Sequence, residues 1–297
     1  MKHLSARMID FIVKHRRPGS YALYAIGQRI VSAYENRDVV MTTNGERWLI
    51  KQLASVGRLE AFDVGANQGE WAQNFLECTK NGHVTCFEPV PTTFAALSTA
   101  VQSERATLVQ LGMGDTPGQI AINSVVDNPH ISSLYDMRSY EGEIEVEKVD
   151  VSLSTGDVEM AKRNVSHLNM LKIDAEGHDF KALTGFGDAL TEGRIDVIQF
   201  EYNYFTVIAR TALRDFYDLL EEHFLLCRLL PQGLEVSGFH HSMDTFAQAN
   251  WIAVRKSFIT PEIVLLLNMR SARGLGGVAL VKALWPAAGF VDTKIRS

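Results

Sequence analysis

The chain has 297 residues, of which 46% are hydrophobic and 22% charged, and its 29 Lys and Arg against 35 Asp and Glu give a net charge of −6. These proportions are typical of a globular protein and exclude collagen-like, coiled-coil and wholly disordered chains. The acidic balance argues against a dedicated nucleic-acid-binding protein, because neutralising phosphates requires a clustered basic surplus.

The cysteines are odd in number and follow neither a CxxC nor a metal-ligand spacing: Cys78, Cys86 and Cys227. They indicate buried small side chains in a reducing compartment rather than disulfides or a zinc module. Residues 8–13 are too short an apolar run for a signal peptide. The late apolar stretch 274–291 contains a lysine and a proline, which makes a poor membrane span. We therefore expect a cytoplasmic protein without a transmembrane segment.

The N-terminal residues 1–17 carry five basic residues and one acid. Apolar residues recur there at helical spacing: Leu4, Met8, Phe11 and Ile12. This pattern predicts a basic amphipathic helix that ends before the Pro-Gly pair at 18–19. Packing on its own domain or on a partner subunit of a homo-oligomer is the favoured interpretation, and contact with an anionic membrane surface is the alternative.

From about residue 59, short apolar runs alternate with helical patterns. The predicted strands are Leu59–Val64, His83–Glu88, Thr107–Gly112, Asn169–Asp174 and Asp196–Tyr202. The predicted helices between them include Trp71–Lys80, Thr92–Gln102 and Asp179–Leu190. Alternation of this kind predicts an α/β domain with a parallel sheet covered by helices on both faces.

Two regions depart from this alternation. The interval 114–154 contains two strand-like runs without a helix between them, Gln119–Asn123 and Glu143–Leu153. Near the end of the core, Phe224–Leu230 and Asn250–Arg255 also lack a long helix between them. The second pair predicts a terminal antiparallel strand pair added to the parallel sheet.

The domain organisation follows from these elements. We expect an N-terminal helical extension over residues 1–50, a catalytic and cofactor-binding domain over 51–257, and a C-terminal helical tail over 258–297. In the tail, Pro261 opens a predicted helix over Glu262–Met269.

The segment AFDVGANQGEW (residues 61–71) is an apolar strand that ends in an acid, passes through Gly-x-Asn-x-Gly and opens a helix. Glycines allow the backbone to turn tightly near a ligand, and a helix start offers free N–H groups to an anion. The spacing differs from the Gly-x-Gly-x-x-Gly of dinucleotide sites, which disfavours a nicotinamide-dependent oxidoreductase. S-adenosylmethionine lacks a pyrophosphate but carries a carboxylate and an ammonium, which suit Asp63 and the glycine turn.

A second acid supports a nucleoside cofactor. The predicted strand HVTCF (residues 83–87) is followed by Glu88, nineteen residues after Gly69. A carboxylate at the tip of the second strand can accept hydrogen bonds from both hydroxyls of a ribose.

At these motifs the sequence resembles the FkbM-type S-adenosylmethionine-dependent methyltransferases, over about residues 58–256. The segments that carry the resemblance are FDVGANQGEW (62–71), CFEPVP (86–91), LGMGD (111–115), LKIDAEGHDFKAL (171–183), FEYNYF (200–205), ALRDFYDLLEEHF (212–224), RLLPQGL (228–234) and NWIAV (250–254). The resemblance implies a class I, Rossmann-like methyltransferase fold with a mixed seven-stranded sheet. It also implies O-methylation of a hydroxyl on a sugar, glycan or natural product.

Carried over by position, the resemblance implies three groups of cofactor-binding residues. Those around the methionine moiety are Asp63, Gly65, Ala66, Asn67 and Gly69. Glu88 is implied at the ribose, and Gly112, Met113, Gly114 and Asp115 near the adenine. Pro89, which follows Glu88, is also expected to contact the cofactor. Asp174, at the end of a later strand, is also expected to contact the cofactor.

The ends of two further strands carry the candidate catalytic residues. They are Lys172, Asp174, His178 and Glu201. His178 is the predicted general base because its unperturbed pKa is about 6.5. Asp174 or Glu201 would orient the imidazole or accept the proton directly. The structural alternative is that Lys172 pairs with a carboxylate and Asp179 caps the next helix.

Two alternatives to this mechanism stay open. Asp174, Glu201 and Asn203 supply the oxygen ligands that Mg²⁺ prefers, so a metal-assisted transfer is one of them. The other is a non-catalytic scaffold that retains the fold. The acceptor is expected to be a small molecule or a glycan.

Overall fold

The computed structural model describes residues 2–125, 132–133, 146–271 and 279. Its main element is a nine-stranded mixed sheet with the order β13-β11-β10-β12-β9-β8-β1-β2-β3. These strands are β1 (Glu60–Val64), β2 (His83–Phe87), β3 (Ala106–Val109), β8 (Leu168–Ile173), β9 (Ile195–Tyr202), β10 (Phe224–Leu230), β11 (Gly233–Val236), β12 (Ala249–Arg255) and β13 (Met269–Ser271).

The order of the strands confirms the predicted α/β fold. Strands β1, β2, β3, β8 and β9 pair in parallel, as the five apolar runs predict. The third run, predicted over Thr107–Gly112, is shorter than expected, because β3 ends at Val109 and Gly112 begins a strand of another sheet. Strand β12 pairs antiparallel with both β9 and β10, which confirms the antiparallel pair at the end of the core. The run from β3 to β10 is the mixed seven-stranded sheet of class I methyltransferases, and β11 and β13 extend it at one edge.

A second, four-stranded sheet accounts for the interval that departs from the alternation. Its order is β4-β7-β5-β6. The strands are β4 (Gly112–Met113), β5 (Gly118–Val125), β6 (Ser132–Ser133) and β7 (Val146–Ser154). Strands β5 and β7 pair antiparallel and contain the described parts of the two predicted runs. Residues 126–131 and 134–145 of this interval lie outside the described residues.

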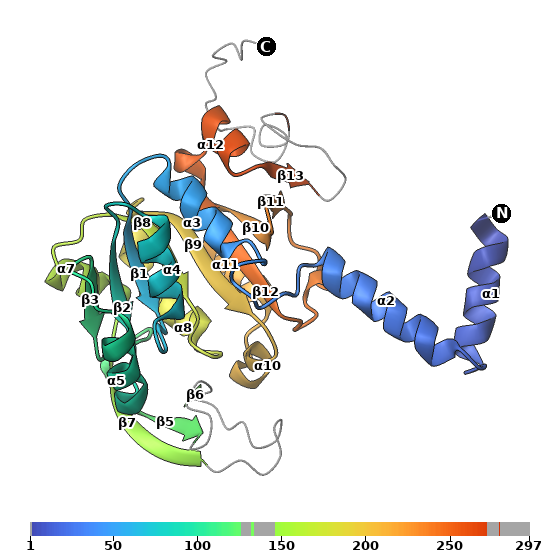
Figure 1. Cartoon of the computed structure of the whole chain (residues 1–297), viewed down its shortest axis with the longest axis horizontal. Coiled ribbons are helices and arrows are strands. Elements are labelled where there is room, and N and C mark those ends of the chain that lie inside the picture. Colours follow the sequence, from blue (N-terminus) through green and yellow to red (C-terminus); the bar gives the residue numbers. More distant parts are fainter. Residues whose placement is uncertain (1, 126–131, 134–145, 272–278, 280–297) are drawn as a thin grey trace.

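Helices cover both faces of the large sheet (Figure 1). They are α3 (Glu46–Ala54), α4 (Glu70–Cys78), α5 (Pro91–Ala100), α7 (Gly156–Lys162), α8 (Asp179–Thr184), α9 (Gly187–Thr191), α10 (Phe205–Ala209), α11 (Leu213–Leu220) and α12 (Pro261–Leu266), with 3₁₀ turns at His241–Met243 and Lys256–Phe258. Successive residues of β1 point to opposite faces of the sheet and pack in different hydrophobic cores. Ala61 packs in the core that contains α3 and α4, and Phe62 in the core that contains α8, α9 and α11. This follows from the two-residue period of a strand.

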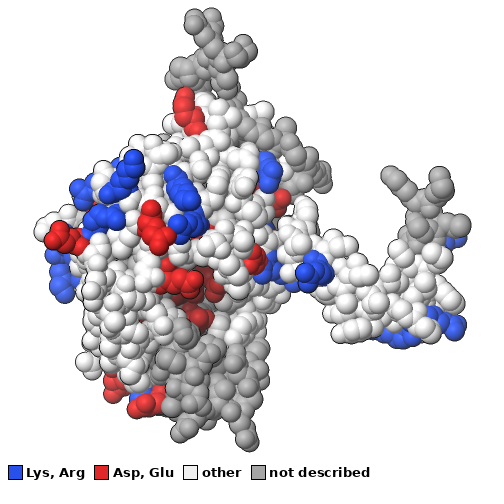
Figure 2. All heavy atoms as spheres, viewed as in Figure 1, with Lys and Arg blue, Asp and Glu red and all other residues white. Residues whose placement is uncertain are grey.

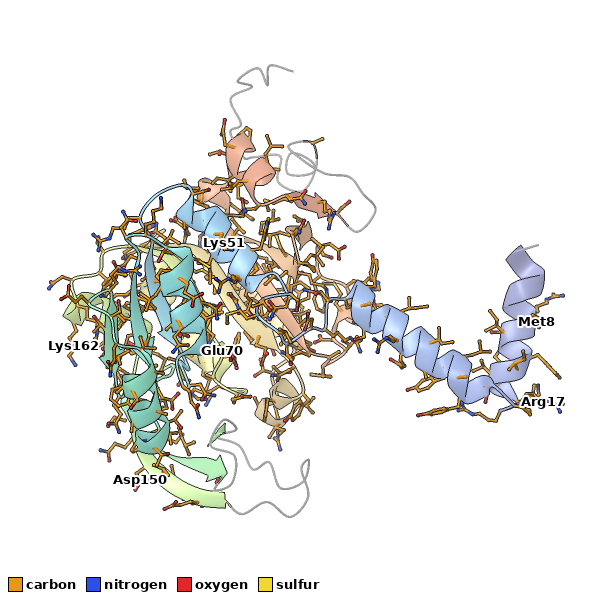
Figure 3. All side chains as sticks on the ribbon, viewed as in Figure 1. Met8, Arg17, Lys51, Glu70, Asp150 and Lys162 are labelled. Atoms are coloured by element: carbon orange, nitrogen blue, oxygen red, sulfur yellow. The ribbon has the colours of Figure 1, made fainter. Side chains whose placement is uncertain are left out.

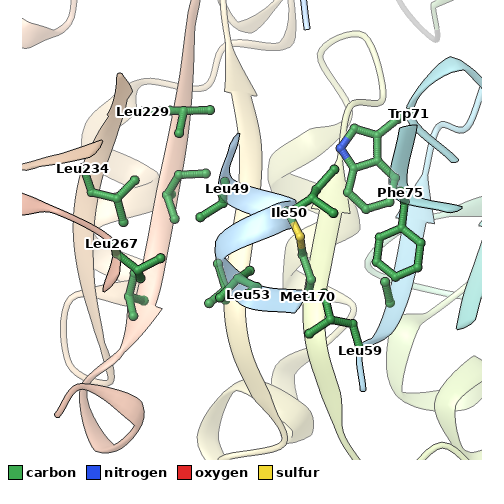
Figure 4. Close-up of a cluster of buried hydrophobic side chains, with 14 of the residues drawn as sticks. Leu49, Ile50, Leu53, Leu59, Trp71, Phe75, Met170, Leu229, Leu234 and Leu267 are labelled. Carbon is green, nitrogen blue, oxygen red and sulfur yellow. The ribbon is translucent and has the colours of Figure 1, made fainter. Parts of the chain in front are cut away.

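Helix α3 spans the boundary expected at residue 51. Its Leu49, Ile50 and Leu53 are buried against Leu59 and Met170 of the sheet region (Figure 4). The segment just before residue 51 therefore contributes to the core beside the glycine turn. Among the described cysteines, Cys86 and Cys227 are buried and all three are free thiols, as predicted.

At the C-terminal end, the helix predicted over Glu262–Met269 is shorter than expected. Helix α12 ends at Leu266, and Asn268 adopts a left-handed φ of 42° that turns the chain out of the helix. Met269 then begins β13, which pairs in parallel with β11. Residues 272–278 and 280–297 of the predicted helical tail lie outside the described residues.

The N-terminal part forms two helices, α1 (Lys2–Lys14) and α2 (Ser20–Tyr34), which project away from the sheet (Figure 1). Helix α1 matches the predicted basic helix. Helix α2 lies in the expected helical extension, but its bounds are not predicted, because its apolar residues occupy most of its circumference and give no distinct period. No helix in the described part of the chain is long and apolar enough to cross a membrane.

Candidate active site

A cavity of about 490 Å³ lies at the carboxyl ends of the parallel strands. Its lining follows the order of the strands across the sheet: Glu88 after β2, Gly65 after β1, Asp174 after β8, Glu201 on β9 and Asn250 on β12. This is where ligands bind in open α/β sheets, and the volume is in the range of about 300–1,000 Å³ of small-molecule sites.

The turn after β1 forms one wall of the cavity. Gly65 has a φ of 74°, and a Cβ there would lie 1.9 Å from the carbonyl oxygen of Asp174. The N–H groups of Gly65 and Ala66 both donate to the carbonyl oxygen of Phe87 at 3.0 Å. Only glycine fits this position, so the turn is fixed by the backbone and leaves an open surface for a ligand.

Glu88 lies next to this turn and is 6% exposed. Its two carboxylate oxygens accept hydrogen bonds from the backbone N–H groups of Asn67 and Val90, each at 3.0 Å. Burial raises the pKa of Glu88 to about 7, although these two N–H groups oppose the rise. The carboxylate keeps further lone pairs toward the cavity, so it can accept from a ribose diol.

An apolar slot adjoins Glu88. It is lined by Pro89, Val90, Met113, Ile122 and Leu153. Ile122 and Leu153 come from the second sheet, and Gly112 of the same sheet leaves room for the Leu153 side chain, since a Cβ at Gly112 would lie 2.6 Å from it. A flat ring such as adenine fits between apolar walls of this kind. The sequence predicts Pro89, Gly112 and Met113 here, but not the contribution of Ile122 and Leu153.

Asp63 does not line the cavity. It is fully buried beneath the glycine turn, where its carboxylate lies 3.0 Å from the ammonium of Lys172. Lys172 also donates to the carbonyl oxygen of Gly65 at 3.1 Å and lies 3.7 Å from Asp174. Burial raises the pKa of Asp63 despite Lys172. For Lys172, burial opposes the charge, but Asp63 and Asp174 outweigh it and raise the pKa. The pair therefore supports the turn from below.

Three carboxylates form a cluster in the cavity. Ligand oxygens of Asp174, Glu176 and Glu201 lie within 4.8 Å of one another. Figure 2 shows acidic side chains gathered in a hollow of this face. Burial and then the charge of Asp174 raise the pKa values of Glu176 and Glu201 well above their usual range. Burial and mutual repulsion therefore oppose full ionisation of these three carboxylates.

Asn203 is not a member of this cluster. Its side-chain amide donates to Glu201, and its Oδ1 accepts from the N–H of Phe205 at 2.9 Å. The oxygen that would bind a metal therefore accepts one hydrogen bond at the start of α10 and keeps a second lone pair, so Asn203 as a ligand stays a prediction. Glu176 takes the third place in the acidic cluster, and its φ of 47° directs the chain into the cavity wall.

His178 lines the cavity and is 5% exposed. Neither ring nitrogen has a hydrogen-bond partner among the described residues. Burial, and then the charge of Lys181, lowers its pKa to about 4, so the imidazole is neutral at pH 7. The preceding turn is held by Asp179, whose carboxylate accepts from the N–H groups of Ala175 at 3.2 Å and Gly177 at 3.0 Å. His178 is therefore a neutral imidazole in the cavity lining that can accept a proton, and its lowered pKa makes it a weaker base than the ordinary value of 6.5 predicts.

A polar wall that the sequence does not predict closes the cavity beyond Glu201. Its centre is Glu46 at the start of α3, which accepts from Asn44 at 2.7 Å and from Gln199 at 2.6 Å. Asn250 donates to Glu46 at 3.5 Å, and Gln248 donates to Glu201. Burial raises the pKa of Glu46. These residues come from distant parts of the chain, so no local motif identifies them.

Three other predicted cofactor residues lie outside the cavity lining. Gly69 starts α4 with a φ of 91°, and a Cβ there would lie 2.4 Å from Val101. A side chain at Gly114 would begin 3.3 Å from Nε2 of His178, so this glycine leaves room for the imidazole. Asp115 is exposed. These positions support the site or lie beside it, and their expected contact with the cofactor stays a prediction.

The fold and the site define a class of protein. A mixed seven-stranded sheet in this order, a glycine turn after β1, an acid after β2 and an apolar slot after Glu88 are the features of a class I S-adenosylmethionine-dependent methyltransferase. The family model of the methyltransferase FkbM domain matches residues 63–244. The chain belongs to this family. The match decides against a nicotinamide-dependent oxidoreductase.

The following individual proteins share part of this fold or sequence at low identity. The chain is 25% identical over 183 residues to the hexuronic acid methyltransferase AglP of Haloferax volcanii. The aligned region covers 60% of this chain and 70% of that relative. Among solved structures, the plantazolicin methyltransferase BamL in complex with a triazolic desmethylPZN analog and SAH is 9% identical, covers 84% of this chain and 94% of that chain, and has a TM-score of 0.41. A precorrin-6y methyltransferase of Geobacter metallireducens is 10% identical, covers 70% and 87%, and has a TM-score of 0.38.

Proposed function

We propose that the protein transfers a methyl group from S-adenosylmethionine to a hydroxyl of an uncharged sugar or a similar polyol. The observation that carries this proposal is the division of the cavity into an apolar slot with one carboxylate and a region lined by carboxylates and amides. Side chains of Glu46, Gln199 and Asn250 offer both donors and acceptors, which hydroxyl groups can use together. The similarity to a hexuronic acid methyltransferase supports a carbohydrate acceptor.

The charge of the cavity favours an uncharged acceptor over a hexuronate. The acids of the described lining are Glu46, Glu70, Glu88, Asp174, Glu176 and Glu201. Lys172 is the basic residue among the described lining residues that carries a charge at neutral pH, and it is already paired with Asp63. A substrate carboxylate would enter this cavity without a free cationic partner, which is costly in a partly buried site. The same charges attract a sulfonium cation.

The reaction follows from the positions of these groups. When bound, S-adenosylmethionine supplies an electrophilic methyl group on a sulfonium sulfur. The glycine turn and Glu88 would hold the donor, and Glu201 and the wall around Glu46 would orient the acceptor oxygen. A ring nitrogen of neutral His178 would accept the hydroxyl proton when the methyl group is transferred. Glu201 and Asp174 are the alternative proton acceptors.

The proposal is tested with the purified full chain and a panel of acceptors. Neutral methyl glycosides and the matching methyl hexuronides are incubated with S-adenosylmethionine, and release of S-adenosylhomocysteine and the methylated product are measured. We expect turnover with neutral glycosides, at a kcat/KM at least about tenfold above that of the hexuronides, because an unpaired charge costs more than about 1.4 kcal/mol. Faster turnover of the hexuronides would overturn the choice of acceptor.

A metal-assisted transfer is a second candidate, favoured by the cluster of Asp174, Glu176 and Glu201. Carboxylate oxygens at this spacing suit Mg²⁺, which would lower the pKa of an acceptor hydroxyl. Direct titration of Mg²⁺ into the metal-free protein, with Glu176→Gln as the matched variant, separates the two mechanisms. Binding that is lost in the variant, with activity lost in a chelator, supports the metal; full activity in a chelator removes it.

A further inference from the structure

The arm formed by α1 and α2 leaves a large apolar surface uncovered. Every residue from 21 to 31 is exposed, and the exposed fractions reach 80% at Tyr21, 64% at Ile30 and 63% at Tyr34. In α1, Met8 is 62% exposed. Met8 and Arg17 lie far from the sheet (Figure 3). A helix that is apolar over most of its surface is not stable as a free element in water.

Apart from the buried Ser20 and the tyrosine hydroxyls, the polar residues of α2 lie on one side of the helix. Gln28, Arg29 and Ser32 are spaced so that they share one side of the helix, and the remaining positions are mostly alanine, aliphatic or tyrosine. The apolar face is therefore much wider than the stripe that packs two helices together. At 15 residues the helix is about 22 Å long, so it suits the surface of a bilayer rather than its thickness of about 30 Å.

The charge of the arm is opposite to that of the rest of the chain. Residues 1–34 contain six basic residues and one acid, whereas residues 35–297 contain 23 basic and 34 acidic residues. Arg16 and Arg17 form the bend between the two helices and are exposed. Basic residues beside an exposed apolar face are the pattern by which helices bind anionic lipid.

We propose that this arm, residues 7–34, binds the surface of an anionic membrane, with the apolar face of α2 in the headgroup boundary and the basic bend against lipid phosphates. A second copy that pairs arm to arm is a poorer occupant, because a symmetric pair of arms would bring like charges together. The arm lies outside the part of the chain that matches the family model. Its association is therefore a property of this chain added to the methyltransferase domain.

The root of the arm connects this surface to the active site. Asn36 donates to the carbonyl oxygens of Asn44 and Leu229, at 2.7 and 3.0 Å, and Arg228 donates to that of Glu35 at 3.1 Å. Residues Val39 and Met41, which follow the root, line the active-site cavity. A membrane-bound arm would therefore hold the opening of the cavity at a defined distance from the lipid surface.

The experiment is vesicle co-sedimentation of the full chain. The vesicles contain phosphatidylcholine alone or phosphatidylcholine mixed with phosphatidylglycerol. We expect binding to the mixed vesicles, weakened about 30-fold by the double change Arg16→Gln and Arg17→Gln, at about fivefold for each charge. The change Ile26→Ser with Ile30→Ser should weaken binding about tenfold or more for each residue.

The matched control is Arg58→Gln with Lys80→Gln, which removes two exposed basic residues from the body. It should bind as the unchanged protein does, and all variants should keep the thermal unfolding midpoint. Light scattering without vesicles gives the mass in solution. Equal binding to both kinds of vesicle, no binding, or a dimer that Ile26→Ser with Ile30→Ser separates while vesicle binding persists would each overturn the proposal.

Discussion

The two halves of the cavity are built in different ways. Beside Glu88, the shape is set by backbone: the turn at Gly65, the paired N–H groups at the carbonyl of Phe87, and the donors from Asn67 and Val90. Around Glu201, it is set by charged and amide side chains from separate elements. A backbone site tolerates changes of side chain, whereas a side-chain site changes its specificity with one substitution. The half around Glu201 is therefore the one in which a substitution should change the acceptor that binds.

His178 provides the strongest test of this division, because it belongs to the half that performs the chemistry. We expect His178→Ala to lower kcat by roughly 10²–10⁴-fold, the usual contribution of a general base. The dissociation constant of S-adenosylmethionine should stay within about twofold. Turnover by the S-adenosylhomocysteine assay and calorimetric titration of the cofactor measure the two effects. His223→Ala, outside the cavity lining, is the control, and an unchanged kcat in His178→Ala would assign the proton to Glu201 or Asp174.

Lys172 joins the two halves, since it contacts Asp63, Gly65 and Asp174. Lys172→Met leaves the buried carboxylate of Asp63 unpaired, so we expect the unfolding free energy to fall by about 3–5 kcal/mol. The double variant with Asp63→Leu should recover most of that loss, because it removes the orphaned charge. Chemical denaturation measures both. If Lys172→Met unfolded with the same free energy as the unchanged protein, the ion pair of Lys172 and Asp63 would not stabilise either half of the cavity.

The sequence predicts the backbone half well, because its determinants are local. The turn is a contiguous segment, Gly65, Ala66 and Asn67, and Glu88 follows Gly69 by nineteen residues. Both features can be recognised from the sequence without knowledge of the fold. Asp63 shows the limit: its position suggests a ligand contact, but the register of β1 points it into the core beside Lys172.

The side-chain half could be predicted only in part. His178 and Glu201 follow strands, and strand ends converge in this fold. Glu46 lies 153 residues from its partner Gln199, and no spacing rule connects a helix start to the middle of a later strand. Ile122 and Leu153 likewise reach the cavity only because β4, β5 and β7 form a second sheet. Such contacts depend on tertiary packing, which a single sequence does not reveal.

The protonation of Glu88 gives a pH-dependent test of the half of the cavity that holds the cofactor. Its pKa of about 7 means that it is protonated in mildly acidic solution and then cannot accept from both ribose hydroxyls. Affinity for S-adenosylmethionine should therefore rise with pH through about 7, approaching tenfold for each unit below it. Glu88→Gln should weaken binding by about 10- to 100-fold and remove this step. Calorimetric titrations between about pH 5.5 and 8.5 test this, and a pH-dependent step that persists in the variant would place it elsewhere.

The raised pKa of Glu88 also predicts how the unfolding free energy changes with pH. The native state holds a proton on Glu88 at pH values where the unfolded chain, with an ordinary value of 4.5, has lost it. The contribution of Glu88 to the unfolding free energy therefore falls as pH rises from about 4.5 to 7. Glu88→Gln should flatten that fall in thermal or chemical denaturation of the cofactor-free protein. An equally steep fall in the variant would assign it to the carboxylates around Glu201.

Glu46 provides the smallest and most selective test of the comparison. Glu46→Gln keeps the size of the side chain but replaces one acceptor by a donor that would face Asn44 or Gln199, both of which donate to it now. Losing one hydrogen bond to a charged group costs about 1.5 kcal/mol, so KM for the acceptor should rise about tenfold. The affinity for S-adenosylmethionine should not change, because Glu46 lies beside β9 and β12 whereas Glu88 follows β2, several strands away in the sheet. Glu77→Gln, exposed and outside the cavity, is the matched control. If the variant weakened the cofactor as much as the acceptor, the two halves would not be separate sites, and the charge of the cavity would act on both ligands together.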